Sequence, residues 1–285
     1  MVSQRGWIAD RLRSGHEFKI GDDIWMLSGS PIKESQYTYF SRAVFECKIV
    51  HKREGIPSHA IVKIWMQTQK IAPLDPRHRR NSHDSGDSSH GSDSPPSNSD
   101  SPPLGSDPDA GSNSDFVFKQ DWDRELECLN IMKKGYDEMK AAAVKEKVEL
   151  LSKPFPHAIG LAVEKQEQNF PVQGGYLVYL VMEKLPGDCI TEYEFWQWTK
   201  SERDDFRRAF EQSAQLIEKL GVENIDKAMR NLLWDKQNNK CYLIDWENWT
   251  TCNPDDPYPL PDLQCQYDMI RDLGPRMGQD RWDTD

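Results

Sequence analysis

The sequence predicts an α+β fold, with strands concentrated in the first half of the chain and helices in the second half. Aromatic and β-branched residues alternate with polar ones at 24–27 and 37–50, and residues 60–66 form a nearly continuous apolar run typical of a buried strand. Apolar residues at helical spacing follow at 121–135 and 201–221. With 285 residues, the chain is long enough for one domain of two lobes or for two small domains.

Composition excludes several classes of protein. The formal net charge of −11 argues against broad binding to nucleic acid or to an anionic membrane. Six cysteines occur without a CxxC pair, so neither a zinc site nor a disulfide framework is indicated. The N-terminus lacks an apolar leader, and the longest apolar run, 176–182, is too short to span a bilayer. We therefore expect an intracellular protein, cytoplasmic or nuclear.

A lysine interrupts the apolar strand at 60–66, whose sequence is AIVKIWM. An ammonium group buried in a strand is costly unless it contacts an anion, so Lys63 predicts a nearby carboxylate or phosphate. The alternative is that Lys63 lies on an edge strand and extends its charged end into solvent.

A polar segment at 79–115 separates this strand from the first helix. Residues 81–115 contain 12 serines and 7 aspartates and no Lys or Arg. Such a segment cannot bury enough apolar surface to offset its chain entropy, so we expect a disordered insertion. Ser94 and Ser101 each precede a proline and are candidate sites for phosphorylation by other kinases, while the alternative is a plain solvated linker.

Four helices are predicted after the insertion, the last of them at 263–273. The first covers 121–135 and is expected to end at Gly135, and a second, highly charged helix is expected at 138–151. The third covers 201–221 and is expected to begin with a capping arrangement at Ser201.

The segment 225–249 combines a predicted β-hairpin with three oxygen-bearing side chains. Asp226 and Asn231 precede the first strand of the hairpin, and Asp245 directly follows the second strand. The hairpin therefore brings two carboxylates and an amide oxygen to one of its ends. Hard oxygen ligands of this kind suit Mg²⁺, which keeps water and phosphate oxygens in its other coordination positions.

Three segments together resemble the protein-kinase-like superfamily. The spacing Asp226-x4-Asn231, a hairpin and then Asp245 resembles the catalytic and metal-binding loops of protein kinases. The strand around Lys63 is similar to the V-A-I-K strand, and YLVYLVMEKLPGD at 176–188 resembles the strand and hinge that join the two kinase lobes. The chain is most similar to the fungal-type and small-molecule-phosphotransferase-like branches.

The resemblance implies a two-lobed kinase-like fold. Residues 1–20 would form an N-terminal arm, and 21–184 a small β-rich N-lobe that carries the insertion at 79–115. Residues 185–285 would form a truncated, mainly helical C-lobe with the catalytic hairpin.

The resemblance also implies catalytic roles for individual residues. Lys63 would contact the phosphates of ATP, and Glu125 would orient Lys63. Glu127 is an alternative register for that glutamate. Asp226 would accept the proton of the acceptor hydroxyl.

The implied cofactors are ATP and Mg²⁺. Asn231 and Asp245 would hold the metal. Met182 would be the gatekeeper beside adenine, and backbone groups near Glu183 and Leu185 would face the adenine ring.

The sequence departs from the kinase pattern at several positions. Asn224 and Ile225 replace the usual His-Arg before the catalytic aspartate, and Ala228 stands where many protein kinases have lysine. Glu247 replaces the glycine two residues after the metal aspartate, and Gly29 is the only glycine at 28–37, where a Gly-rich phosphate clamp is expected. Two functions follow: an ATP- and Mg²⁺-dependent phosphotransferase acting on an unidentified hydroxyl acceptor, or a pseudokinase that binds a nucleotide or a protein.

Overall fold

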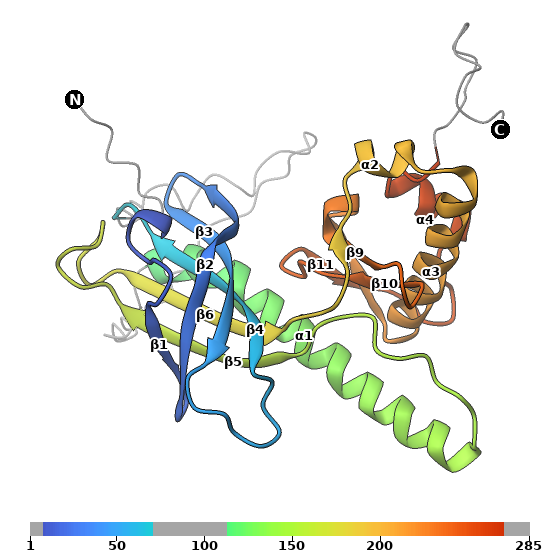
Figure 1. The fold of residues 1–285 in the computed structure, drawn as a ribbon, viewed down its shortest axis with the longest axis horizontal. Helices are drawn as coiled ribbons and strands as arrows, with labels where there is room; N and C mark the ends of the chain where they lie inside the picture. The colour runs from blue at the N-terminus through green and yellow to red at the C-terminus, as the bar shows by residue number, and fades with distance from the viewer. Residues whose placement is uncertain (1–7, 71–112, 271–285) are drawn as a thin grey trace, which may run out of the picture.

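The structure, a computed structural model, describes residues 8–70 and 113–270 (Figure 1). Its N-terminal part is built on one antiparallel sheet with the strand order β1-β2-β3-β4-β6-β5. The strands of this sheet are β1 (Glu17–Ile20), β2 (Asp23–Gln36), β3 (Phe40–Ile49), β4 (His59–Gln67), β5 (Ala158–Lys165) and β6 (Tyr176–Glu183). A short 3₁₀ turn, η1 (Ile8–Asp10), precedes it.

The C-terminal part contains most of the helices, as Figure 1 shows. The long helix α1 (Asn113–Glu146) connects β4 to β5 in the sequence, and the later helices are α2 (Glu192–Gln197), α3 (Lys200–Lys219) and α4 (Leu260–Gln266). Five short strands and the 3₁₀ turn η3 lie among them in the described residues: β7 (Asp188–Cys189), β8 (Val222–Asn224), η3 (Met229–Asn231), β9 (Leu232–Asp235), β10 (Lys240–Leu243) and β11 (Trp249–Thr251).

At this coarse level the α+β prediction is correct: a sheet-rich N-terminal part precedes a part with several helices. The strand at 60–66 becomes β4, and the strand at 176–183 becomes β6. The predicted hairpin at 225–249 becomes the antiparallel pair β9–β10. These segments are short and strongly patterned, so local sequence is sufficient to indicate them.

The two faces of the large sheet are covered differently. One face packs a core against η1 that includes Phe45, Val62 and Tyr179, each with no exposed surface. The other face packs against α1, where Trp65 meets Trp122. Side chains alternate between faces along a strand, so this second face also receives the alternate residues of β4, including Lys63.

Helix α1 joins the two parts of the molecule. Trp122 near its start belongs to the core beside the sheet, while Leu129 and Met132 belong to the core with α3. The predicted end of this helix at Gly135, and the separate helix at 138–151, are wrong, because α1 is continuous to Glu146. Gly135 has a packing role instead, since a Cβ there would lie 3.0 Å from the side chain of Leu220.

One further prediction near the N-terminus needs correction. Residues 8–20 do not form an arm, because Ile8 and Leu12 are buried under the sheet and β1 pairs with β2. The segment 28–36, to which no element was assigned from the sequence, is a continuation of β2 with a register shift between Ser28 and Lys33. The irregularity lets the strand bend without ending.

The N-cap of helix α3 lies two residues before the predicted one. Its N-cap is Thr199, whose hydroxyl accepts from the backbone N–H of Glu202 while the Glu202 carboxylate accepts from the Thr199 N–H. This capping box displaces the weaker arrangement expected at Ser201. The apolar stripe of the helix, with Phe206, Phe210 and Ile217, is buried as predicted.

The expected disordered insertion, including Ser94 and Ser101, lies outside the described residues apart from its last three residues, 113–115, which are the first turn of α1. Within the described residues, every helix is too short or too polar to cross a membrane.

Gly187 makes possible the close approach of the chain after β6 to strand β9. Its φ is +97°, and a Cβ there would lie 2.6 Å from the backbone nitrogen of Asp235 and 2.7 Å from the carbonyl oxygen of Trp234. Only glycine meets both conditions without strain.

We predict that Gly187→Ala lowers the free energy of unfolding by about 3 kcal/mol, because it combines a left-handed backbone with a backbone clash. Gly174→Ala is the matched control. Its φ is +75° with no described atom within 4 Å of the added Cβ, so it should cost only about 1 kcal/mol. Urea denaturation measures both values, and equal losses would contradict the packing argument.

Candidate functional site

Lys63 forms the centre of a buried ion cluster. Its ammonium group donates to both carboxylate oxygens of Glu125, at 2.7 and 2.8 Å, and to Oδ1 of Asp245 at 2.6 Å. The exposed fractions of the three side chains are 7%, 1% and 11%. The lysine therefore does not extend into solvent, and the carboxylate expected from its burial comes from α1 and from the loop after β10.

The sheet brings two more cations to the same carboxylate. The Lys33 ammonium nitrogen lies 3.8 Å from Oδ2 of Asp245, and a guanidinium nitrogen of Arg42 lies 3.7 Å from Oδ1. Arg42 also forms an ion pair with Glu247. Asp245 is thus surrounded by one basic side chain from each of β2, β3 and β4.

The electrostatics of the cluster follow from this arrangement. Burial on its own raises the pKa of a carboxyl group, but the charges of Lys63 and Arg42 outweigh it and lower the pKa of Asp245 to about 2. Burial would lower the pKa of Lys63, but Asp245 and Glu125 raise it. Burial raises the pKa of Glu125, although Lys63 opposes the shift. Lys63 and Asp245 are therefore a charged pair at neutral pH.

A second cluster surrounds Asp226. Its carboxylate accepts from the guanidinium of Arg230 through both oxygens, at 2.6 and 2.8 Å, and from the side-chain amide of Asn231 at 3.0 Å. The Asn231 amide also donates to the backbone oxygen of Asp226 at 2.8 Å. The turn η3 thus keeps Asp226 and Asn231, the two defined residues of the Asp-x4-Asn pattern, in contact.

Asn224 links the two clusters. Its side-chain oxygen accepts from the backbone N–H of Asp226 at 2.9 Å, and its side-chain nitrogen donates to the backbone oxygen of Asp245 at 3.0 Å. Asp245 itself has a φ of +66°, a left-handed conformation that aspartate tolerates better than most residues. In the sequence Asn224 is only a departure from the kinase pattern, whereas in the structure it is the connection between both aspartates.

Three residues of the first cluster are not among the site residues predicted from the sequence: Arg42, Lys33 and Glu247. Arg42 carries a weaker signal than Lys63, because its strand also contains the charged residues Glu46 and Lys48. Lys33 gives no such signal, since it lies in a polar stretch. Of the two candidates for the helix glutamate, Glu125 contacts Lys63, whereas Glu127 is exposed.

Several oxygens here are suited to a hard cation. One carboxylate oxygen from each of Glu125, Asp245 and Glu247 lies within 4.8 Å of the others. Oδ1 of Asn231 and Oε2 of Glu247 are buried and accept no hydrogen bond from the described residues. Carboxylate and amide oxygens of this kind fit Mg²⁺, and a buried acceptor without a donor is otherwise costly.

The predicted adenine-facing residues lie at the end of β6. Met182 and Leu185 are buried, at 5% and 9% exposure. The Glu183 carboxylate forms an ion pair with Lys153 and lies 2.8 Å from Nδ1 of His157. This pair of contacts anchors the segment that leads from the large sheet into the C-terminal part.

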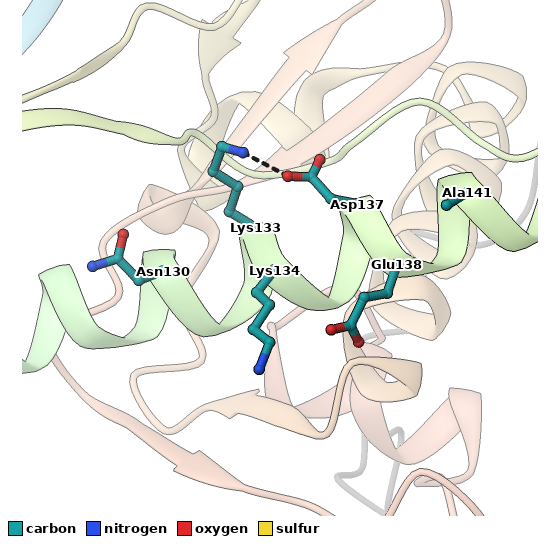
Figure 2. A pocket seen from close by; sticks show the side chains of 6 residues that line it. All are labelled: Asn130, Lys133, Lys134, Asp137, Glu138 and Ala141. Atoms are coloured by element: carbon teal, nitrogen blue, oxygen red, sulfur yellow. Dashed lines mark hydrogen bonds and ion pairs between the residues drawn. The ribbon is translucent and has the colours of Figure 1, made fainter.

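The outer surface of α1 has a different character. A shallow hollow lies there, in which Lys133 pairs with Asp137 at 2.5 Å. Figure 2 shows the side chains of Lys134 and Glu138 on the opposite side of the helix from this pair. Such i,i+4 pairs are typical of a solvated helix face. The hollow is lined by Asn130, Lys133, Lys134, Asp137, Glu138 and Ala141, and it shares no residue with the two clusters.

No protein-family model matches the chain, and no curated protein matches it either.

We predict that Lys63→Met lowers the free energy of unfolding by about 3 kcal/mol or more, because it leaves two buried carboxylates without their shared cation. Lys48→Met is the control, since Lys48 is exposed on β3. Adding Glu125→Gln to Lys63→Met should recover part of the loss by removing one of the stranded charges. Urea denaturation at pH 7 measures the free energy of unfolding of Lys63→Met, of Lys48→Met and of the double variant. A loss below about 1 kcal/mol would mean that the cluster is not a strong stabilising contact.

Glu183 provides a test in acid. Burial on its own raises the pKa of this carboxyl, but hydrogen bonds from His157 and Lys153 outweigh it and lower the pKa of Glu183 to about 2. The unfolded value is about 4.3. The ionised contacts therefore stabilise the fold fully above that value, and their contribution disappears as the pH falls through about 2.

We expect Glu183→Gln to cost about 1 to 2 kcal/mol at pH 7, since part of the side chain is screened by solvent, and clearly less at pH 3. Glu46→Gln, which removes an exposed pair with Lys184, should cost about 0.5 kcal/mol or less at both pH values. Denaturant unfolding at pH 7 and at pH 3 gives the loss in free energy of unfolding for each of the two variants relative to the wild type. A cost for Glu183→Gln that does not shrink in acid would refute the ion-pair assignment.

Proposed function

We propose that the protein is an ATP- and Mg²⁺-dependent phosphotransferase of the protein-kinase-like superfamily, which transfers a phosphoryl group to a hydroxyl acceptor. The observation that carries this proposal is the contact of Lys63 with both Glu125 and Asp245. Active protein kinases require a strand lysine paired with a helix glutamate, together with a metal-binding aspartate. Here the lysine comes from β4, the glutamate from α1 and the aspartate from the loop after β10.

The arrangement of elements also supports the proposal. The proposal includes a two-lobed fold, with residues 21–184 as the β-rich N-lobe and residues 185–285 as the shortened, mainly helical C-lobe. The large sheet, the helix α1 against one of its faces and the connecting segment after β6 occur in the order that this fold requires.

Each side chain then has a chemical task. ATP would supply the phosphoryl group, and Mg²⁺ would neutralise the charge of its phosphates. Lys63 would contact the phosphates, with Glu125 keeping its ammonium group in position. Asn231 and Asp245 would hold the metal, and Glu247 adds a third oxygen donor that the kinase pattern lacks.

Asp226 would orient the acceptor hydroxyl and take its proton. A phosphorus–oxygen bond to the acceptor forms, the bond between phosphorus and the leaving ADP breaks, and the hydroxyl proton passes to the carboxylate. Met182 and the backbone of Glu183 and Leu185 would contact the adenine ring, because they lie between the two parts of the chain at the end of β6.

One observation favours a second function, that of a pseudokinase. Both oxygens of Asp226 are held by Arg230, and Asp245 is surrounded by Lys33, Arg42 and Lys63. A site already neutralised in this way could serve as a binding module without turnover.

The two functions differ in the effect of Asp226→Asn. The variant keeps the shape of the side chain and removes its charge, so nucleotide affinity should change little. Phosphoryl transfer should fall by about 100-fold or more, the range typical of a lost general base. The measurements are transfer of labelled γ-phosphate into a broad set of hydroxyl acceptors and, separately, stabilisation against unfolding by Mg²⁺-ATP.

Asp256→Asn is the control, because Asp256 is exposed and its backbone N–H donates to Asn253, which belongs to neither cluster. At 100 times the dissociation constant, nucleotide should add about 2.7 kcal/mol of stability to the wild type and to both variants. Full transfer activity in Asp226→Asn would reject its catalytic role. Stabilisation of the wild type without transfer to any acceptor would favour the pseudokinase, and the absence of both would reject the nucleotide site.

A further inference from the structure

We propose that Lys33 and Arg42 form, with Lys63, a cradle of side-chain cations for a polyphosphate, which takes the place of a glycine-rich loop. The inference rests on the proposed function, because it identifies the residues that would hold the phosphates of the nucleotide. It assigns a binding role to two residues outside the kinase pattern.

Strand register puts the three cations on one face of the sheet. Lys33 is paired with Val44, and Val44 is paired with Lys63. Directly paired residues of antiparallel strands point to the same face, and so do residues two apart on one strand. Arg42 is two residues from Val44, so its side chain shares that face.

The three side chains also converge on one point. Each lies within 4 Å of a carboxylate oxygen of Asp245, although they come from three successive strands. Lys63 and Arg42 are almost fully buried, whereas the side chain of Lys33 is 44% exposed. The cluster is therefore closed on the Lys63 side and open to solvent on the Lys33 side, where an anion could enter.

The backbone of β2 does not offer the alternative of a glycine-rich clamp. Gly29 has a φ of +71° and lies at the edge of the irregularity in β2, but its N–H already donates to the hydroxyl of Ser14 at 3.0 Å. The strand then continues past Lys33 to Gln36 instead of opening into a loop. Phosphate contacts from this hairpin would thus come from side chains.

A charge exchange explains how the cradle could open. Without ligand, Lys33, Arg42 and Lys63 are neutralised by Asp245 and Glu247 together with Glu125. A metal-bound polyphosphate carries both signs of charge, so it can offer oxygens to the cations and a cation to the carboxylates. Arginine suits this task because its planar guanidinium can bind phosphate through two parallel hydrogen bonds.

The test compares a ligand that has phosphates with one that lacks them. Dissociation constants of ATP and of adenosine are measured at one Mg²⁺ concentration for the wild type, Arg42→Met, Lys33→Met and the control Lys48→Met. The ratio of the adenosine constant to the ATP constant isolates the phosphate contribution. A purely structural role for Arg42 would weaken both ligands together and leave the ratio unchanged.

We expect the ratio to fall by about 10-fold in Arg42→Met and about threefold in Lys33→Met, which is the more exposed of the two cations. Arg42→Lys, which keeps the charge, should recover part of the ratio, and Lys48→Met should leave it at the wild-type value. Loss of Arg42 strands the Glu247 carboxylate, so the comparison is repeated with Arg42→Met in a Glu247→Gln background against Glu247→Gln alone.

Inorganic tripolyphosphate separates this inference from the proposed function. If ATP binds and the ratio is unchanged in Arg42→Met and Lys33→Met, the cradle is rejected while the nucleotide site stands. If adenosine and ATP do not bind but tripolyphosphate binds and weakens in the variants, the cradle stands and the adenine site is rejected. If neither ATP nor tripolyphosphate binds the wild type, the cradle is rejected.

Discussion

The burial of a single ammonium group is the constraint on which the other contacts depend. Lys63 has 7% of its side chain exposed, and a charge in that position is tolerated only if its hydrogen bonds are satisfied by anions. Glu125 and Asp245 supply them from 62 and 182 residues further along the chain. The large sheet, helix α1 and the loop after β10 must therefore all be correctly placed before this lysine can be buried.

The same cluster limits what can bind beside it. Three cations and three carboxylates lie together, so removing any one of them leaves an excess of the opposite charge in the cluster. A simple anion would pair with Lys33, Arg42 and Lys63 but leave Asp245 and Glu247 without cations. A bare metal ion would pair with the two carboxylates but leave the three cations without anions. A ligand that carries both signs of charge can replace the internal contacts without stranding either set, which is the physical reason to expect a metal-bound polyphosphate.

Sequence was sufficient for the features that depend on local pattern and not for those that depend on tertiary contact. Strands β4 and β6 and the hairpin β9–β10 were predicted, because a few residues specify each of them. Lys63 was recognisable from the cost of burying it. Arg42 needs the register of β2 and β3 after the irregularity at Ser28, and Gly135 ends no helix because packing against Leu220 decides its environment, so neither could be interpreted from spacing alone.

The departures from the kinase pattern are better judged by contacts than by residue identity. Asn224 stands where a histidine is usual, yet an amide side chain has both an acceptor and a donor, so it can hold the backbone N–H of Asp226 and the backbone oxygen of Asp245 at once. Both bonds go to the main chain, and they are insensitive to the side chains of the two aspartates. The loop that carries Asp226 is therefore tied to the loop that carries Asp245, and a shift of either loop would be transmitted to the other through Asn224.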